Sequence, residues 1–464
     1  MTKTRKMHFG LSVAHLGYHP AAWRMPDVPV DGTMNLQHYV NCAKIAERGK
    51  LDFLFFADVS GVRQFGDARA PRHREQQQSK HEPFTLIAAL AALTEEIGFV
   101  GTASTTFQHP YNLTRRLATL DHLSGGRAAW NMVTSWSEDE AENFGLATTG
   151  TSDERHARAH EFVSVVKRLC DTWEDGAFVQ DKESGIFFDR EKLHFLDHEG
   201  DQFRIKGPLD LPRPPQGVPP IATAGASENA QELAAAHADI VYAGQPNIEL
   251  ARAYYASLKA KTWKYGRTPD DVKIMPGIMT FVAPTRAEAQ AKLDRLNACI
   301  DPVMGFGHML VSGLPDLSAC PLDSLVPEAD SELVAYPTGQ PSGFAMSLMK
   351  RARADGKTVR QLMEMVLGGD LWQLGIVGTP TDVADKLEEW FSTGAADGFN
   401  VQAAYLPGAA EDFVELVVPE LQRRGLFRTE YEGRTLRDRL GIARPQNSFT
   451  LSETAARVGT LATR

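Results

Sequence analysis

The chain has 464 residues, of which 43% are hydrophobic and 23% are charged, and this composition is typical of a folded globular protein. Its net charge of −10 argues against nucleic acid as the main partner, because binding to a phosphate backbone needs a basic face. No stretch approaches the roughly 18 apolar residues of a membrane span, and the basic start MTKTRKMHFG lacks the apolar part of a signal peptide, so we expect a cytoplasmic protein without a membrane partner.

Eight short apolar runs rich in β-branched and aromatic residues alternate with helical patterns along the chain. Most of these runs are continuous, as in strands that are buried on both faces of a parallel sheet. The expected strands are 7–13, 51–58, 97–106, 127–135, 219–227, 239–244, 273–283 and 398–406. The expected helices are 35–49, 82–96, 112–126, 228–238, 247–266 and 381–398.

Strands that alternate with helices indicate βαβ units and a parallel sheet. Eight such units predict an α/β protein with a (β/α)8 TIM barrel, whereas an open doubly wound sheet, the alternative, rarely uses so many. A bare barrel needs roughly 250 residues, so about 200 are extra. We expect them in large insertions after strand 4 (136–218) and strand 7 (284–380) of a single domain, 1–445, followed by a C-terminal arm or disordered tail, 446–464.

A turn of small residues, Ala224-Gly225-Ala226-Ser227, joins the fifth expected strand to the next helix. In a barrel, the carboxyl ends of the strands carry the active site. Gly225 would let a ligand approach the backbone, and Ser227 can cap the helix or donate to a phosphate at its positive end. A turn that only packs tightly and caps the helix is the commoner explanation of such a sequence. Since no GxGxxG follows the first strand, a Rossmann-type dinucleotide site is not expected.

Two further strand-end residues have both a functional and a structural interpretation. Asp58 ends the second run and can orient a cofactor or lid, or it can cap a helix or hold an arginine. Asn131, in the fourth run, offers a donor and an acceptor to a heteroaromatic edge, although an amide bonded to neighbouring loops fits as well.

The histidines and cysteines do not predict a metal site. His156 and His160 stand four residues apart on one helical face, a spacing that can chelate a metal. The charged residues around them favour a solvated helix with ion pairs instead. The four cysteines lie far apart without a CxxC pair, which indicates neither a zinc site nor a disulfide framework.

Long, ordered segments that cover about 7–445 resemble one family. They are WNMVTSWSEDEAENFG (130–145), ERHARAHEF (154–162), TWEDGAFVQDKESGIFFD (172–189), RIKGPLDLPRPPQGVPPIATAGAS (204–227) and ADGFNVQAAYLPGAAEDFVELVVPELQRRGLFRTEYEGRTLRDRLGI (396–442). The chain is similar to the nitrilotriacetate and dibenzothiophene-sulfone monooxygenases, a group within the bacterial-luciferase-like, FMN-dependent enzymes.

The resemblance implies a (β/α)8 barrel that binds FMN at its carboxyl mouth. Reduced FMN would come from a separate NAD(P)H-dependent flavin reductase, and O2 would be the co-substrate. A C4a-peroxyflavin would insert one oxygen atom into the substrate and release the other as water. Such an intermediate needs a dry site, and the glycine-rich segment 284–380 is the expected lid. Homodimers or homotetramers are expected as well.

The resemblance also implies which residues bind the flavin. They are Asp58, Ser104, Thr105, Asn131, Thr134, Ala224, Gly225 and Ser227. His156 stands where the family usually has tyrosine near the phosphate, and a partly protonated imidazole can still pair with a phosphate dianion. His19 and His109 are candidate catalytic proton donors, with ordinary loop histidines as the alternative.

The substrate is expected to be a small aromatic, heterocyclic or organosulfur compound, because aromatic residues follow the first, third and fourth strands. Two other functions stay open. One is a flavin-degrading lyase that acts on riboflavin or FMN itself, and the other is a flavin-binding protein without catalytic activity.

Overall fold

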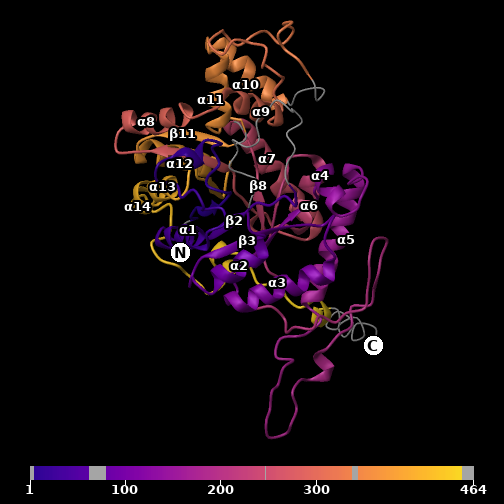
Figure 1. Cartoon of the computed structure of the whole chain (residues 1–464). Helices are drawn as coiled ribbons and strands as arrows, with labels where there is room; N and C mark the ends of the chain where they lie inside the picture. The colour runs from indigo at the N-terminus through magenta and orange to yellow at the C-terminus, as the bar shows by residue number, and fades with distance from the viewer. Residues whose placement is uncertain (1–4, 62–79, 246, 337–342, 372, 452–464) are drawn as a thin grey trace.

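The computed structural model describes residues 5–61, 80–245, 247–336, 343–371 and 373–451. Within them, a ten-stranded parallel sheet forms the centre of the molecule, and helices surround it (Figure 1). Its strands are β1 (His8–Ser12), β2 (Phe53–Phe56), β3 (Gly98–Ser104), β4 (Ala128–Val133), β7 (Ile221–Ala224), β8 (Ile240–Tyr242), β9 (Lys273–Ile274), β10 (Gly277–Val282), β11 (Leu374–Gly378) and β12 (Gly398–Gln402).

The sheet curls back on itself. Its strand order is β11-β10-β12-β1-β2-β3-β4-β7-β8-β9, and only Met275 and Pro276 separate β9 from β10 in the chain. The carbonyl of Ile274 in β9 accepts a hydrogen bond from the amide of Asp397 before β12 (2.8 Å), and the carbonyl of Pro276 accepts one from Asn400 (2.9 Å). The predicted α/β class with a curled parallel sheet is therefore confirmed.

Seven helices follow or connect these strands on the outside of the sheet. They are α1 (Leu36–Arg48), α2 (Pro83–Ala91), α3 (Pro110–Ser124), α5 (Ser152–Cys170), α6 (Glu228–His237), α7 (Ile248–Lys261) and α12 (Pro380–Ser392). Local sequence sets their starts, because Thr151 and Glu154 form a capping box at α5, and Thr379 and Asp382 form one at α12. The six helices expected between the strands are all present, and α5 contains the helical face that was expected for His156 and His160.

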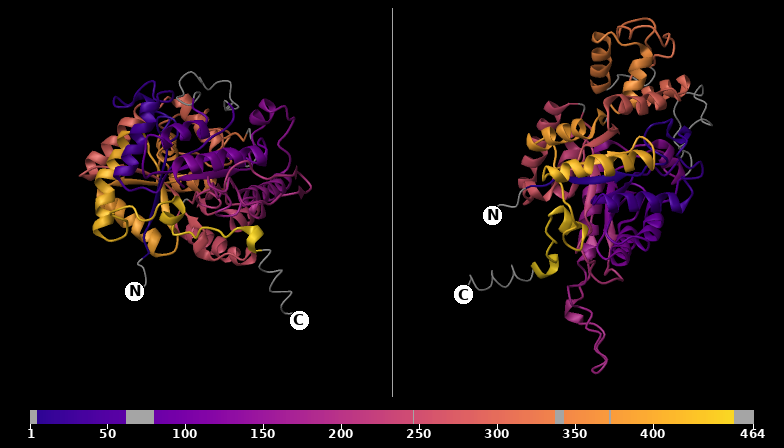
Figure 2. Two further views of the ribbon diagram at one scale, coloured as in Figure 1. Left: turned by 90° about the horizontal axis from the view of Figure 1, so that it is seen from below. Right: turned by 90° about the vertical axis from the view of Figure 1, so that its left-hand side faces the viewer.

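Two long segments extend the sheet-and-helix body at opposite ends (Figure 2). Between β10 and β11 lie α8 (Arg286–Asn297), α9 (Pro302–Val311), α10 (Gly343–Ala354) and α11 (Val359–Leu367). The apolar side chains of α9 to α11 form a separate cluster around Met309, Leu348 and Leu362. The strand β11 in the predicted insertion 284–380 was not expected from the sequence.

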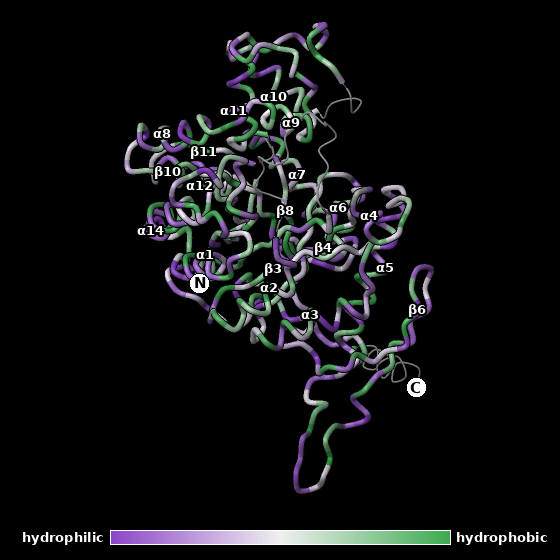
Figure 3. Tube along the Cα trace, in the orientation of Figure 1, coloured by the Kyte–Doolittle hydropathy of each residue, from purple (hydrophilic) through white to green (hydrophobic). Residues whose placement is uncertain are grey.

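The second long segment joins β4 to β7. It contains α4 (Glu138–Asn143), α5, and a projecting loop with the short strands β5 (His198–Glu199) and β6 (Arg204–Ile205). Hydrophilic and hydrophobic residues alternate along this loop (Figure 3). The predicted insertion 136–218 thus encloses α5, which packs between α3 and α6 like the other surrounding helices.

The C-terminal part of the chain closes the amino end of the curled sheet. After β12 come α13 (Gly408–Asp412), a π-helical turn (Phe413–Val417), α14 (Val418–Arg423) and α15 (Leu436–Leu440). Leu436 and Leu440 of α15 pack against Phe53, Val100 and Ala129, which project inward from β2, β3 and β4. This cluster fills the interior below the carboxyl ends of the strands.

A buried aspartate precedes each of three strands and holds the neighbouring strand. Asp52, Asp239 and Asp397 accept backbone hydrogen bonds from Phe9 (2.7 Å), Ile221 (2.9 Å) and Ile274 (2.9 Å), respectively. Each carboxylate is also paired with a cation: Arg428 with Asp52, Arg437 with Asp239 (3.1 Å) and Lys259 with Asp397 (2.9 Å). Two of these cations belong to the C-terminal segment, so that segment completes the base of the sheet.

The expected arm 446–464 is described only as far as residue 451. Asn447 is buried, and its amide donates to the carbonyls of Asp171 (2.8 Å) and Trp173 (3.2 Å), so this part packs on the body of its own chain. Residues 452–464 lie outside the described residues. No helix in the described ranges combines the length and apolar character that crossing a membrane requires.

Replacing Arg437 tests the buried pairs at the base. Arg437→Gln leaves the Asp239 carboxylate buried without its main cation, and we expect the free energy of unfolding to fall by about 3–5 kcal/mol. The matched control is Arg360→Gln in the exposed pair with Asp323, where we expect a loss below about 1 kcal/mol. If urea unfolding gave the same loss of free energy for both variants, the buried pair would stabilise the fold no more than the exposed one.

The same pairs predict acid sensitivity. Burial by itself raises the pKa of Asp239, but the charges of Arg437, Arg267 and Lys167 outweigh it and hold the pKa below its ordinary value. A carboxyl whose folded pKa is depressed stabilises the fold above the unfolded pKa of about 4, and this contribution is lost as the pH falls through the folded pKa. We expect the free energy of unfolding to drop below about pH 4, and to drop less in Arg437→Gln. If the free energy of unfolding of Arg437→Gln fell as steeply with decreasing pH as that of the parent protein, the buried pair would not be the cause of the acid sensitivity.

Candidate functional site

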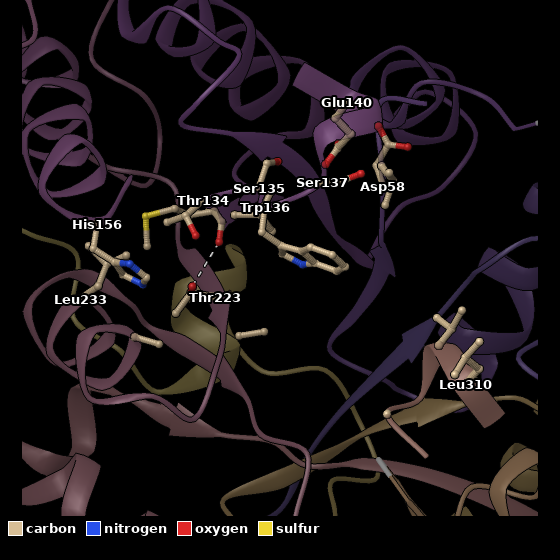
Figure 4. Close-up of a pocket in the computed structure, with 17 residues that line it drawn as sticks. Asp58, Thr134, Ser135, Trp136, Ser137, Glu140, His156, Thr223, Leu233 and Leu310 are labelled. Carbon is tan, nitrogen blue, oxygen red and sulfur yellow. Dashed lines mark hydrogen bonds between the residues drawn. The ribbon is translucent and has the colours of Figure 1, made fainter. Parts of the chain in front are cut away.

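A cavity of about 660 Å³ opens at the carboxyl ends of the strands. The lining residues come from the loop after β2, from β4, α4, α5, β7 and α6, and from the end of α9, so segments far apart in the sequence meet there. His156 of α5 and Leu310 of α9 lie on opposite sides of the cavity (Figure 4). The lining residues are Asp58, Val59, Met132, Val133, Thr134, Ser135, Trp136, Ser137, Glu140, His156, Thr223, Ala224, Ala230, Leu233, Leu310, Val311 and Gly313.

Four of the residues predicted for the site, Asp58, Thr134, His156 and Ala224, line this one cavity. The other predicted flavin contacts lie on the same strand ends without being part of the lining. They are Ser104 and Thr105 at the end of β3, Asn131 within β4, and Gly225 and Ser227 directly after β7. The two predicted catalytic histidines, His19 and His109, do not line the cavity.

The turn after β7 brings the backbone to the edge of the cavity. Gly225 has a φ of 140°, which L side chains rarely adopt, and a Cβ atom there would lie 2.6 Å from the Cβ of Ala230. Ser227 caps α6, because its side chain accepts a hydrogen bond from the amide of Ala230 (3.3 Å). The first turn of α6 therefore faces the strand ends with a bare backbone and a hydroxyl, which suits an anionic group.

Hydrogen bonds fix the polar residues at the ends of β3 and β4. The Nδ2 of Asn131 donates to Oγ1 of Thr102 (2.9 Å), and Oδ1 of Asn131 is buried without a hydrogen-bond partner in the described structure. The Oγ of Ser104 accepts from the amide of Thr106 (3.1 Å), and the amide of Thr105 donates to the carbonyl of Val133 (2.9 Å). The contacts of Asn131 with Thr102 and of Thr105 with Val133 join β3 to β4 near these ends.

One side of the cavity is acidic. The Asp58 carboxylate lies 2.8 Å from the ammonium group of Lys80, yet burial raises its pKa more than this cation lowers it. Glu140 of α4 is buried and accepts a hydrogen bond from the amide of Ser60 (2.8 Å). Trp136 lies beside these residues and is 74% exposed, so it forms an apolar rim rather than part of a core.

Of the paired histidines on α5, only His156 lines the cavity. Its Nδ1 lies 2.7 Å from the carbonyl of Ser152. His160 points instead toward α6, where its Nδ1 lies 3.1 Å from Nε2 of His237. Across the described residues, no three His, Cys, Asp or Glu side chains are grouped as metal ligands.

His19 is buried near α8 and α9 rather than in the cavity wall. Its Nδ1 accepts a hydrogen bond from the amide of Ala21 (3.2 Å), which places the proton of the neutral ring on Nε2. Burial is the main cause that lowers its pKa to about 3, and Asn297 and His308 lie beside it. His308 of α9 is likewise held neutral by burial, with a pKa of about 4. Both imidazoles are therefore uncharged near neutral pH.

His109 occupies a different place. It is exposed immediately before α3, and its ring packs edge-on against Phe203, with 6.1 Å between the ring centres. The chain turns outward there because Pro110 opens the helix.

Sequence reasoning missed Glu140 and the α9 residues Leu310 and Val311, since nothing in the sequence of α9 indicates that its end returns to the strand ends.

The comparisons with known proteins extend over nearly the whole chain. The family model described as luciferase-like monooxygenase matches residues 7–397. N-acetyl-S-(2-succino)cysteine monooxygenase of Bacillus subtilis is 42% identical over 97% of this chain and 99% of that protein. Nitrilotriacetate monooxygenase component A of Aminobacter aminovorans is also 42% identical, over 97% of this chain and 99% of that protein. A solved riboflavin lyase with modified FMN and riboflavin is 30% identical, with a TM-score of 0.81 over 95% of this chain and 97% of that one.

A methyl group at position 225 tests the close approach of the turn to α6. We expect Gly225→Ala to lower the free energy of unfolding by about 2–3 kcal/mol, because it adds both an unfavourable φ and a steric clash. Gly266→Ala is the control, since that residue also has a positive φ but no atom within 4 Å of the added Cβ. The double variant Gly225→Ala/Ala230→Gly should recover part of the loss. Additive losses in the double variant would contradict the predicted clash.

Proposed function

Because the chain belongs to the luciferase-like monooxygenases, it is a flavin-dependent oxidoreductase of the two-component group, and we propose how its site serves that reaction. The proposed activity uses reduced FMN and O2 to oxygenate a small organosulfur, aromatic or heterocyclic compound. The observation that carries the proposal is the cavity at the ends of β4 and β7, whose lining includes Thr134 and also Ala224, directly before the bare turn at Gly225 and Ser227.

The residues around the cavity fit FMN in two respects. The turn before α6 offers Ser227 and accessible backbone amides, together with His156 and Ala224, to a phosphate. The buried Oδ1 of Asn131 needs a hydrogen-bond donor, and the ring N–H of a flavin supplies one. The residues proposed to hold the ring and the ribityl chain are Asp58, Ser104, Thr105, Asn131 and Thr134.

Reduced FMN, when bound, supplies the electrons that activate O2. The chain's own residues would orient the flavin, exclude water and bind the substrate. Trp136, Leu310 and Val311 provide the apolar walls of the cavity. We propose that the segment 284–380 acts as the cover, because the end of α9 already reaches the cavity from that segment.

The two histidines proposed as catalytic differ in how they can act. His19 is neutral and carries its proton on Nε2, so we propose that it donates a hydrogen bond rather than acting as an imidazolium acid. His109 is exposed beside Phe203 and, like His19, is not part of the cavity lining, and we propose no step for it.

The proposed architecture is a closed (β/α)8 barrel, 1–445, with insertions at 136–218 and 284–380. The ring of hydrogen bonds through β9 and β10 supports closure. The proposed partner is a separate NAD(P)H-dependent flavin reductase, a proposal supported by the designation of one relative as component A. A homodimer or homotetramer is proposed for the oxygenase itself.

Reconstitution tests the activity. The protein is mixed with FMN, NADH, a flavin reductase and 18O2, and a panel of thioethers, sulfones and heterocycles is screened for products that carry one 18O atom. We expect a single labelled oxygen in at least one product, and none when the reductase is omitted. NADH oxidation without labelled product across the panel would contradict the proposal.

The similarity to riboflavin lyase supports a second candidate, a lyase that consumes the flavin itself. The same reaction mixture separates the two. A lyase would destroy the isoalloxazine absorbance in the absence of any panel compound, whereas the proposed oxygenase would leave the flavin intact after many turnovers.

Ser227 should distinguish FMN from riboflavin. We expect Ser227→Ala to weaken FMN binding about tenfold, the effect of losing one hydrogen bond of about 1.4 kcal/mol to a charged group, and to leave riboflavin binding unchanged. Thr285→Ala at the start of α8 removes a helix cap outside the cavity and is the matched control. An equal loss for FMN and riboflavin in equilibrium titrations would place the phosphate elsewhere.

A further inference from the structure

Polar side chains form a layer inside the curled sheet, one step nearer the cavity than the apolar plug around α15. Val100, Ala129 and Ile240 belong to that plug. Two residues further along the same strands, and so on the same inward face, stand Thr102, Asn131 and Tyr242.

The opposite part of the layer comes from β1 and β12. Ser12 is paired with Phe55 of β2, which contacts the plug, and Gln402 is paired with Ser12. Ser12 and Gln402 therefore also face inward. The hydroxyl of Tyr18 is hydrogen-bonded to Ser12, which closes this side of the layer.

The orientation of the Asn131 amide follows from its partner. Oγ1 of Thr102 donates its only proton to the carbonyl of Phe56 (2.7 Å), so it can only accept from Asn131. Nδ2 of Asn131 is thereby committed to Thr102. Its Oδ1 is left as a buried acceptor without a donor among the described residues, in a side chain that is 5% exposed.

Gln402, on the opposite side of the polar layer, also has an acceptor oxygen without a hydrogen-bond donor. Its Nε2 lies 3.3 Å from the hydroxyl of Tyr242, while its Oε1 is buried without a donor in the described structure. The side chain of Gln402 is 6% exposed. Tyr242 reaches this position because residue 277 is glycine, where a Cβ would lie 2.5 Å from the Tyr242 hydroxyl oxygen. The interior thus holds the Gln402 amide with an oxygen atom that accepts no hydrogen bond from the described residues.

We infer that Asn131 and Gln402 form an acceptor floor that selects reduced over oxidised FMN. This inference rests on the proposed flavin site. An oxidised isoalloxazine ring has acceptor lone pairs at N1 and N5, whereas neutral reduced flavin has N–H donors at both positions. A buried acceptor without a donor is destabilising, so a ring that brings more donors binds more favourably. Asn131 and Gln402 are then positioning residues whose amide oxygens discriminate between the redox states of the cofactor.

Such discrimination suits an oxygenase that receives its flavin from a separate reductase. Preferential affinity for the reduced form would capture the donor-rich ring from solution and allow the oxidised ring to leave after turnover. The same two oxygens could instead be satisfied by buried water, which donates equally in both redox states of the flavin. That alternative predicts no redox preference from these residues.

The test measures affinity rather than activity. Oxidised FMN and dithionite-reduced FMN are titrated anaerobically into the parent protein, Gln402→Met and Asn131→Leu, which are near-isosteric and lack the amide. We expect the parent protein to bind reduced FMN more tightly. Each variant should lower the ratio of the two dissociation constants about tenfold, or about 1.4 kcal/mol. Gln290→Met, on the exposed face of α8, is the control and should leave the ratio unchanged.

The possible outcomes distinguish a failure of this inference from a failure of the proposed flavin site. An unchanged ratio in both variants, or equal weakening of both redox states, would overturn the acceptor floor while leaving the flavin site intact. If the parent protein bound neither form, the proposed function would fail, and this inference with it. Thermal unfolding of each variant shows whether it is folded, and a change of ratio in either folded variant supports the inference.

Discussion

The structure depends on how the amino ends of its parallel strands are tied together. Asp52, Asp239 and Asp397 each bind the backbone of a neighbouring strand while a cation neutralises the buried carboxylate. A charged carboxylate would be strongly unfavourable in this interior without its partner. Because the strands are parallel, fixing their amino ends also gathers their carboxyl ends at the opposite edge, where the cavity lies. The C-terminal segment is therefore far from the cavity and yet necessary for its geometry.

The elements that surround the cavity have little freedom, although the residues that fix them lie outside its lining. The turn at Gly225 leaves no room for a side chain, hydrogen bonds hold the ends of β3 and β4 together, and burial keeps His19 and His308 neutral. A site of this kind suits a preformed cofactor, and its carboxylates, Asp58 and Glu140, lie on one side of the cavity. The side of the cavity formed by Trp136 and the end of α9 has fewer such constraints. There, the exposed ring of Trp136 lies at the cavity opening.

The sheet could be predicted from the sequence because continuous apolar runs such as 51–58 and 97–106 are buried on both faces. The split between β9 and β10 was not visible, since KIMPGIMTFVA reads as one run although Pro276 has no amide proton to continue the pairing. The strand β11 was missed because LGIVG is short and lies among glycines within a long irregular segment.

The strand-end part of the site could also be predicted, because barrel topology makes each strand end a candidate. Thr102 and Gln402 could not be singled out that way, since Thr102 lies within β3 and Gln402, although it ends β12, lies inside the longer expected strand 398–406. Counting two residues onward from the plug would have found Thr102, but identifying the plug required α15 to be placed. His109 also follows a strand closely, but Pro110 starts a helix there, and the ring lies exposed beside Phe203.

The central claim is that one curled sheet brings the ends of β3, β4 and β7 together around a single flavin. A crystal structure of the protein grown with FMN tests this most directly. The account predicts the phosphate at the amino end of α6 beside Ser227, with the ring over the inward-facing Asn131. Electron density for FMN at any other place, with this cavity empty, would contradict it.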